Sequence, residues 1–123
     1  MLIVFLSLLM VLVACSGSEL DGEWERDTFD GRGGVGMSVY VFSRNQFTHY
    51  IYWNIESSLY QERVVRNGYE WFRISRTGNF SISSDQWGNR VELVFDDGHI
   101  RVLPFTRTEN TLTLDGRDRY TRR

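Results

Sequence analysis

Cysteine, proline and lysine are nearly or wholly absent from this sequence, and each absence narrows what the protein can be. The single cysteine, Cys15, cannot form an internal disulfide. All fourteen basic residues are arginines, scattered among sixteen acidic residues to give a formal net charge of −2. Because a nucleic-acid surface requires clustered positive charge, we expect no nucleic-acid partner.

The rest of the composition is typical of one folded domain. A single proline, eleven dispersed glycines and an aromatic content of 15% argue against disorder. The length suffices for one domain, and a chain of this size can bury a core without metals or disulfides.

The one long hydrophobic run lies at the amino terminus. Residues 2–14 are apolar except for Ser7. This run is shorter than the roughly 20 residues of a transmembrane helix but has the length of a signal-peptide core. It ends in Leu12-Val13-Ala14-Cys15, which resembles the lipobox of bacterial lipoproteins. In those proteins the cysteine thiol accepts diacylglycerol, and cleavage then makes that cysteine the new amino terminus.

This resemblance implies a domain organisation and a location. Residues 1–14 are expected to be a lipoprotein signal peptide, residues 15–21 the lipidated Cys15 with a flexible tether, and residues 22–123 the folded domain. Lipid on Cys15 would make the membrane of the bacterial cell envelope a partner. Ser16 after the cysteine resembles the signal for the outer membrane in bacteria that have one.

Beyond the tether, short stretches rich in β-branched and aromatic residues alternate with turn sequences. Asn67-Gly68, Asp97-Gly98 and Asp115-Gly116 are three of these turns. A turn about every ten residues predicts an antiparallel all-β domain. The strongest hairpin prediction is Asp97-Gly98, between apolar residues 91–95 and 100–105.

The alternation of side chains along a strand predicts which residues share a face. His49 lies on one face with Phe47 and Ile51, and Tyr50 and Tyr52 lie on the other. Residues 39–42 are apolar on both faces, so their strand should be central or should line a cavity. The predicted core contains Phe47, Ile51, Val91, Leu93, Phe95, Leu112 and Leu114.

Residues 54–67 fit two structures. Asn54 is suited to capping a short helix that ends at Gly68, or the segment forms a loop and a strand of a long hairpin. We prefer the loop and strand.

Motifs at both ends of the domain resemble the lipocalin-like proteins. Gly22-Glu23-Trp24 matches their first strand, and residues 110–116 and 120–122 are similar to the closing strands of small bacterial lipocalin-like lipoproteins. The resemblance implies a single antiparallel up-and-down β-barrel of about eight strands. It also implies that Trp24 closes one end of the barrel, with Arg122 from the last strand stacked across its ring.

Some sequence patterns resemble catalytic or cofactor sites, but the residues that such sites also require are missing around them. Residues 31–36 spell a dinucleotide-binding glycine motif, but they precede a β-branched strand instead of a helix. The acidic residues after Glu19 do not form a calcium loop, because Arg26 stands where such a loop needs glycine. His49 and His99 lie far apart, with no further ligand at metal spacing. We therefore expect no catalytic, metal or cofactor site and no enzymatic activity.

Aromatic side chains are the candidate functional surface. They either line a cavity for a small apolar ligand or simply fill a small barrel. With a cavity, the protein is a lipid-anchored binding protein; with a filled core, it is an envelope interaction, inhibitor or structural lipoprotein whose partner the sequence does not identify. The candidate ligand pocket consists of Tyr40, Phe42, His49, Tyr50, Tyr52 and Trp71.

Overall fold

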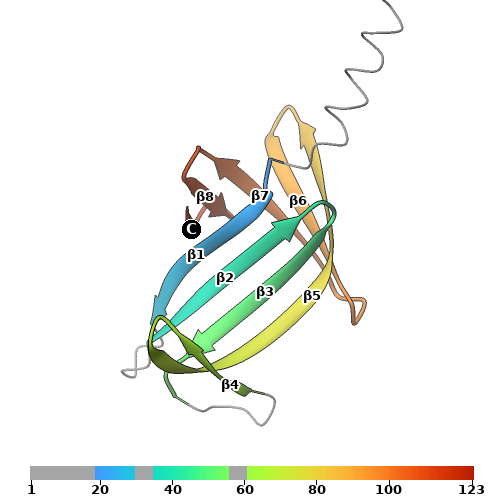
Figure 1. The fold of residues 1–123 in the computed structure, drawn as a ribbon. Coiled ribbons are helices and arrows are strands. Elements are labelled where there is room, and N and C mark those ends of the chain that lie inside the picture. Colours follow the sequence, from blue (N-terminus) through green and yellow to red (C-terminus); the bar gives the residue numbers. More distant parts are fainter. Residues whose placement is uncertain (1–18, 30–34, 56–60) are drawn as a thin grey trace, which may run out of the picture.

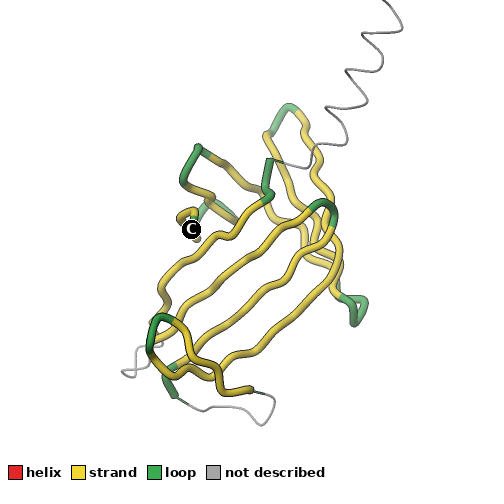
Figure 2. The backbone as a smooth tube through the Cα atoms, in the orientation of Figure 1, coloured by secondary structure: helices red, strands yellow, loops and turns green. Residues whose placement is uncertain are grey.

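The computed structural model describes residues 19–29, 35–55 and 61–123, and every regular element within them is a β-strand (Figures 1 and 2). The all-β fold class is therefore confirmed. The strands are β1 (Gly22–Phe29), β2 (Val35–Ser43), β3 (Gln46–Trp53), β4 (Glu62–Arg66), β5 (Tyr69–Asp85), β6 (Gly88–Phe95), β7 (Ile100–Arg107), β8 (Thr111–Leu114) and β9 (Asp118–Arg122).

Eight of these strands form a closed antiparallel barrel. Neighbours follow the order β3-β2-β1-β9-β8-β7-β6-β5, and β3 pairs with β5 to close the ring. The closing pair is long, running from Gln46↔Asn79 to Trp53↔Phe72. The first and last strands meet only at Trp24↔Arg122 and Glu25↔Thr121. Closure pairs the edges that an open sheet would leave free for other chains.

The predicted core is almost entirely buried inside this barrel. Six of its seven members have relative exposures of 0–3%: Phe47, Val91, Leu93, Phe95, Leu112 and Leu114. Ile51 is partly buried and lies towards one end. The Asp97-Gly98 hairpin is also confirmed, since it joins β6 to β7, which pair in register.

A second apolar cluster lies on the outside of the barrel. Met37, Val39 and Tyr52 face outward from β2 and β3, yet each is at least 92% buried. Val64 of β4 and Trp71 from the start of β5 pack against them. This outer cluster explains why residues 39–42 are apolar on both faces, and it joins the β4–β5 hairpin to the outer face of β2 and β3.

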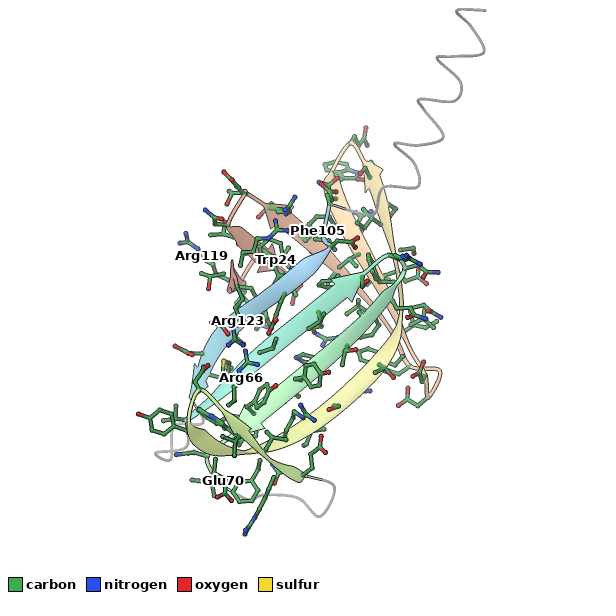
Figure 3. The ribbon with its side chains drawn as sticks, in the orientation of Figure 1. Trp24, Arg66, Glu70, Phe105, Arg119 and Arg123 are labelled. Carbon is green, nitrogen blue, oxygen red and sulfur yellow. The ribbon has the colours of Figure 1, made fainter. Side chains whose placement is uncertain are left out.

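Arg66 at the end of β4 holds the hairpin against the barrel. Its Nη2 lies 3.3 Å from a Glu23 carboxylate oxygen and 3.1 Å from one of Glu25, and its guanidinium lies 5.0 Å from the Tyr52 ring centre (Figure 3). The hairpin agrees with the preferred loop and strand for residues 54–67, of which residues 56–60 lie outside the described ranges. Its turn uses Asn67 and Gly68 at φ 54° and 81°, the left-handed pair of a tight hairpin.

One end of the barrel, here called the floor, is closed around Trp24. The indole is fully buried, and its Nε1–H donates to the Leu20 carbonyl over 2.9 Å. The guanidinium carbons of Arg122 and Arg107 each lie 5.3 Å from the ring centre. Leu20 itself is fully buried, so the packed domain begins before residue 22, inside the segment that we had assigned to the tether. The opposite end is called the mouth.

Barrel closure can be tested by a double-mutant cycle at the floor. Trp24→Ala removes a fully buried indole and should cost about 3–5 kcal/mol of unfolding free energy. Arg122→Ala should cost about 1–2 kcal/mol, through loss of its stacking and of its 3.1 Å hydrogen bond to the Asp21 carbonyl. Because the two side chains share a contact, the double variant should lose less unfolding free energy than the sum of the two single losses. Urea denaturation measures all three.

Arg119 provides the control for this cycle. It lies on the exposed face of the same strand, so Arg119→Ala should change stability by less than about 0.5 kcal/mol. Arg123 is unsuitable, because its Nη1 lies 3.2 Å from Glu23 on the neighbouring strand. Additive effects at Trp24 and Arg122 would contradict the shared contact.

Candidate functional site

The barrel interior is divided into a filled half and a hollow half. The floor half is packed with aromatic and aliphatic side chains, including Phe42, Phe80 and Phe105. The mouth half contains a cavity of about 240 Å³. The inward-facing residues that line it include Arg26, Ser38, Tyr40, His49, Ile51, Trp53, Arg101, Leu103, Asp118 and Tyr120.

The predicted pocket residues divide between three places. Tyr40 and His49 line the cavity. Phe42 belongs to the filled floor half. Tyr50, Tyr52 and Trp71 do not line the cavity: they belong to the outer cluster beneath the β4–β5 hairpin. Their assignment to one pocket with His49 was wrong because odd and even positions of a strand point to opposite faces.

Polar residues that the sequence analysis did not select form part of the cavity wall. Arg26 lies two positions after Trp24 on β1, and Asp118 lies two positions before Tyr120 on β9. Both could have been found by extending the inward face of Trp24 and Arg122 along their strands. Arg101 follows from the β6–β7 register, where it pairs with the core residue Leu93.

A short chain of hydrogen bonds crosses the inner wall of the cavity. The Ser38 hydroxyl lies 2.8 Å from His49 Nε2 and 2.8 Å from the Tyr120 hydroxyl. The Tyr40 ring stacks on the imidazole with 4.0 Å between ring centres and 2° between planes. Ser38 and Tyr120 are almost fully buried, so these contacts satisfy groups that water cannot reach.

The cavity lining contains two arginines, Arg26 and Arg101, and two aspartates, Asp115 and Asp118. At the seam between β1 and β9, Arg26 Nη2 lies 3.8 Å from an Asp118 carboxylate oxygen. Arg101 has no ion pair with any residue in the described ranges. Within the same ranges, Arg26 Nε and Thr28 Oγ1 are buried without a hydrogen-bond partner. These groups can still bind an acceptor that enters the cavity.

This environment keeps the imidazole of His49 neutral. Burial, and then the positive charges of Arg76, Arg101 and Arg26, lower the pKa of His49 to about 4. Burial also raises the pKa of the Tyr40 hydroxyl, with a further contribution from Tyr120. Both stacked rings are therefore uncharged at neutral pH, and the charged groups of the cavity are its arginines and aspartates.

Two further observations concern metals and membranes. Among residues 19–29, 35–55 and 61–123, no three histidine or carboxylate side chains come together as metal ligands. The same ranges contain no helix with the length and apolar character needed to span a membrane.

Comparison with protein-family models, curated protein sequences and solved structures finds no match to this chain. The architecture itself defines the class: a small, closed, eight-stranded antiparallel β-barrel with a cavity at its mouth.

The lowered pKa of His49 predicts a pH dependence of stability. In the unfolded chain the pKa returns to about 6.5, so between pH 6.5 and 4 the unfolded state binds more protons. Above pH 6.5, His49 is neutral in both states and does not affect the free energy of unfolding. As the pH falls from 6.5 towards 4, the unfolded state gains a proton that the folded state does not bind, so the free energy of unfolding decreases. Urea denaturation should show a loss of about 2 kcal/mol from this group between pH 7 and pH 5.

The two histidines allow a matched comparison. His49→Gln should remove this part of the pH dependence, while the exposed His99→Gln should preserve it. A His49→Gln variant with the same loss between pH 7 and pH 5 as the unmodified protein would contradict the assignment.

Proposed function

We propose that this protein is a lipid-anchored component of the bacterial cell envelope whose barrel binds a small amphipathic anion at its mouth. The observation that carries the ligand proposal is the cavity of about 240 Å³, whose lining combines Arg26 and Arg101 with apolar side chains. The anchor proposal rests on the sequence that ends at Cys15.

The polar side of the cavity favours an acidic group on the ligand. Arg101 lines the cavity with no described carboxylate paired to it, and Arg26 retains an unused buried N–H. A guanidinium binds carboxylate or phosphate through short, charge-assisted hydrogen bonds. Asp118 neutralises Arg26 only in part, at 3.8 Å.

Other residues of the cavity lining favour an apolar ligand body. Ile51, Trp53 and Leu103 provide its apolar wall. A cavity of roughly 150 Å³ accommodates benzene, so this one suits a single ring or a short alkyl chain. The ligand is thus smaller and more polar than the apolar ligand expected from the aromatic residues alone.

The membrane anchor would keep this barrel at the envelope. Two or three acyl chains on Cys15 hold a protein durably in a bilayer, because each buried CH₂ contributes about 0.8 kcal/mol. In a bacterium with an outer membrane, Ser16 supports placement there.

An interaction protein is the second candidate function. Ile100 and Val102, on the outer face of β7, are 55% and 54% exposed. Paired exposed aliphatic side chains on one strand favour a protein contact. The two functions are compatible, because the cavity and this strand face point in opposite directions.

The ligand proposal predicts discrimination between an acid and its matched alcohol. We expect the full-length protein in detergent micelles to bind 3-phenylpropionate more tightly than 3-phenylpropanol in calorimetric titrations. Arg101→Gln should weaken binding of the acid about tenfold or more while leaving the alcohol unchanged, because one charge-assisted hydrogen bond is lost. Arg119→Gln, on the outer face of β9, is the control. Equal affinity for acid and alcohol would contradict the proposal.

The anchor proposal predicts that Cys15 carries the lipid. In cells fed an alkyne-labelled fatty acid, the unmodified protein should incorporate label and Cys15→Ser should not. Ser18→Ala, in the same segment, should be labelled normally. Label retained in the Cys15→Ser protein would show that the anchor lies elsewhere or does not exist.

A further inference from the structure

The largest exposed apolar side chain at the floor end belongs to Trp87. It lies at the tip of the β5–β6 hairpin and is 79% exposed. The Trp87 backbone N–H donates to the Asp85 carboxylate over 2.7 Å, and Arg90 bonds the other oxygen of that carboxylate. The tip is therefore an ordered turn that presents an indole to its surroundings.

The folded domain joins its amino-terminal tether at this same end. Figure 1 shows the start of β1 and the tip of the β5–β6 hairpin at one end of the barrel. The register agrees: Gly22 pairs with Phe42, near the β2–β3 turn, whose Asn45 carbonyl accepts a hydrogen bond from the Phe80 N–H.

The tether is too short to hold the floor far from Cys15. Only five Cα–Cα steps separate Cys15 from Leu20, which is buried beneath Trp24. Five steps span at most about 18 Å when fully extended. An acylated Cys15 lies at the bilayer surface, so the floor must lie within about that distance of the lipid headgroups.

We infer that the floor of the barrel rests on the membrane that holds Cys15, with the Trp87 indole in the lipid headgroup region. This inference rests on the lipid anchor proposed above. Tryptophan suits such a position because its ring is apolar while its N–H remains able to bond water or phosphate. At the adjacent β2–β3 turn, Arg44 is exposed, has no ion pair among the described residues, and can meet lipid phosphate.

The same orientation sets the direction of the mouth. The β6–β7 turn lies at the opposite end of β6 from Trp87, and Arg101, close to that turn, lines the cavity. A barrel resting on its floor therefore opens its cavity to the aqueous phase, and ligand exchanges with water and not with the bilayer.

Fluorescence quenching by brominated lipids tests the inference with the lipidated, full-length protein. Phosphatidylcholine vesicles with bromine near the headgroup should quench up to about a quarter of the emission, because Trp87 is one of four tryptophans. Trp87→Phe should abolish this quenching. Trp71→Phe, which removes an indole of the outer cluster, should preserve it. Equal quenching of the Trp87→Phe and unmodified proteins, or no quenching of either, overturns the inference.

Site-specific labelling provides an independent measurement of orientation. Gln86→Cys at the floor and His99→Cys beside the β6–β7 turn each introduce one reactive thiol on an exposed residue. A polarity-sensitive dye should shift to shorter wavelength on vesicle binding at position 86 and not at position 99. The reverse pattern overturns the inference.

The mass of the intact protein separates the two proposals. If Cys15 carries lipid and Trp87 is not quenched, only the orientation is wrong. If Cys15 carries no lipid, the anchor proposal fails, and the orientation inference fails with it.

Discussion

The pairing of the first strand with the last is the contact on which the rest of this structure depends. It consists of only two register pairs, Trp24↔Arg122 and Glu25↔Thr121. Without it, β1 and β9 would be free edges and the interior would be open to water along one side. The indole at this junction contributes to both parts of the closure. Its strand pairs with β9, and its ring fills the floor beneath two guanidinium groups.

The shortness of this seam also creates the site. Beyond Glu25 the two strands have no further register pairs, and the ion pair between Arg26 and Asp118 bridges them instead. Charged side chains can face inward here because the cavity at the mouth is accessible to solvent. The floor half, by contrast, is filled by phenylalanine and leucine. On β1, two successive inward-facing positions are thus occupied by the apolar Trp24 and the charged Arg26.

Much of this fold follows from local sequence. Turn residues such as Asp97-Gly98 locate the hairpins, and alternation identifies Phe47 and Leu93 as inward-facing. The outer cluster does not follow in the same way, because Val39 and Tyr52 have the composition of core residues whether a barrel wall or a hairpin covers them. Alternation also does not show at which end of the barrel an inward-facing arginine such as Arg26 lies. That depends on the pairing of β1 with β9, whose paired residues are 96 or more positions apart in the sequence. Tyr50 and Trp71 were assigned to the pocket for their chemistry, although the face of Tyr50 was already predicted to be opposite that of His49.

The outer cluster gives the barrel two unlike sides. The wall made by β2 and β3 is packed on both of its faces, and Arg66 forms ion pairs that hold the covering hairpin to β1. Among the described residues nothing covers the opposite wall in this way, and its strand pairings are short, since β7 pairs with β8 at three positions and β9 with β1 at two. Local opening in proteins follows the regions with the fewest buried contacts. Local opening should therefore be concentrated in β7, β8 and β9, so that the strands bearing Tyr40 and His49 stay in place while those bearing Arg101 and Asp118 move.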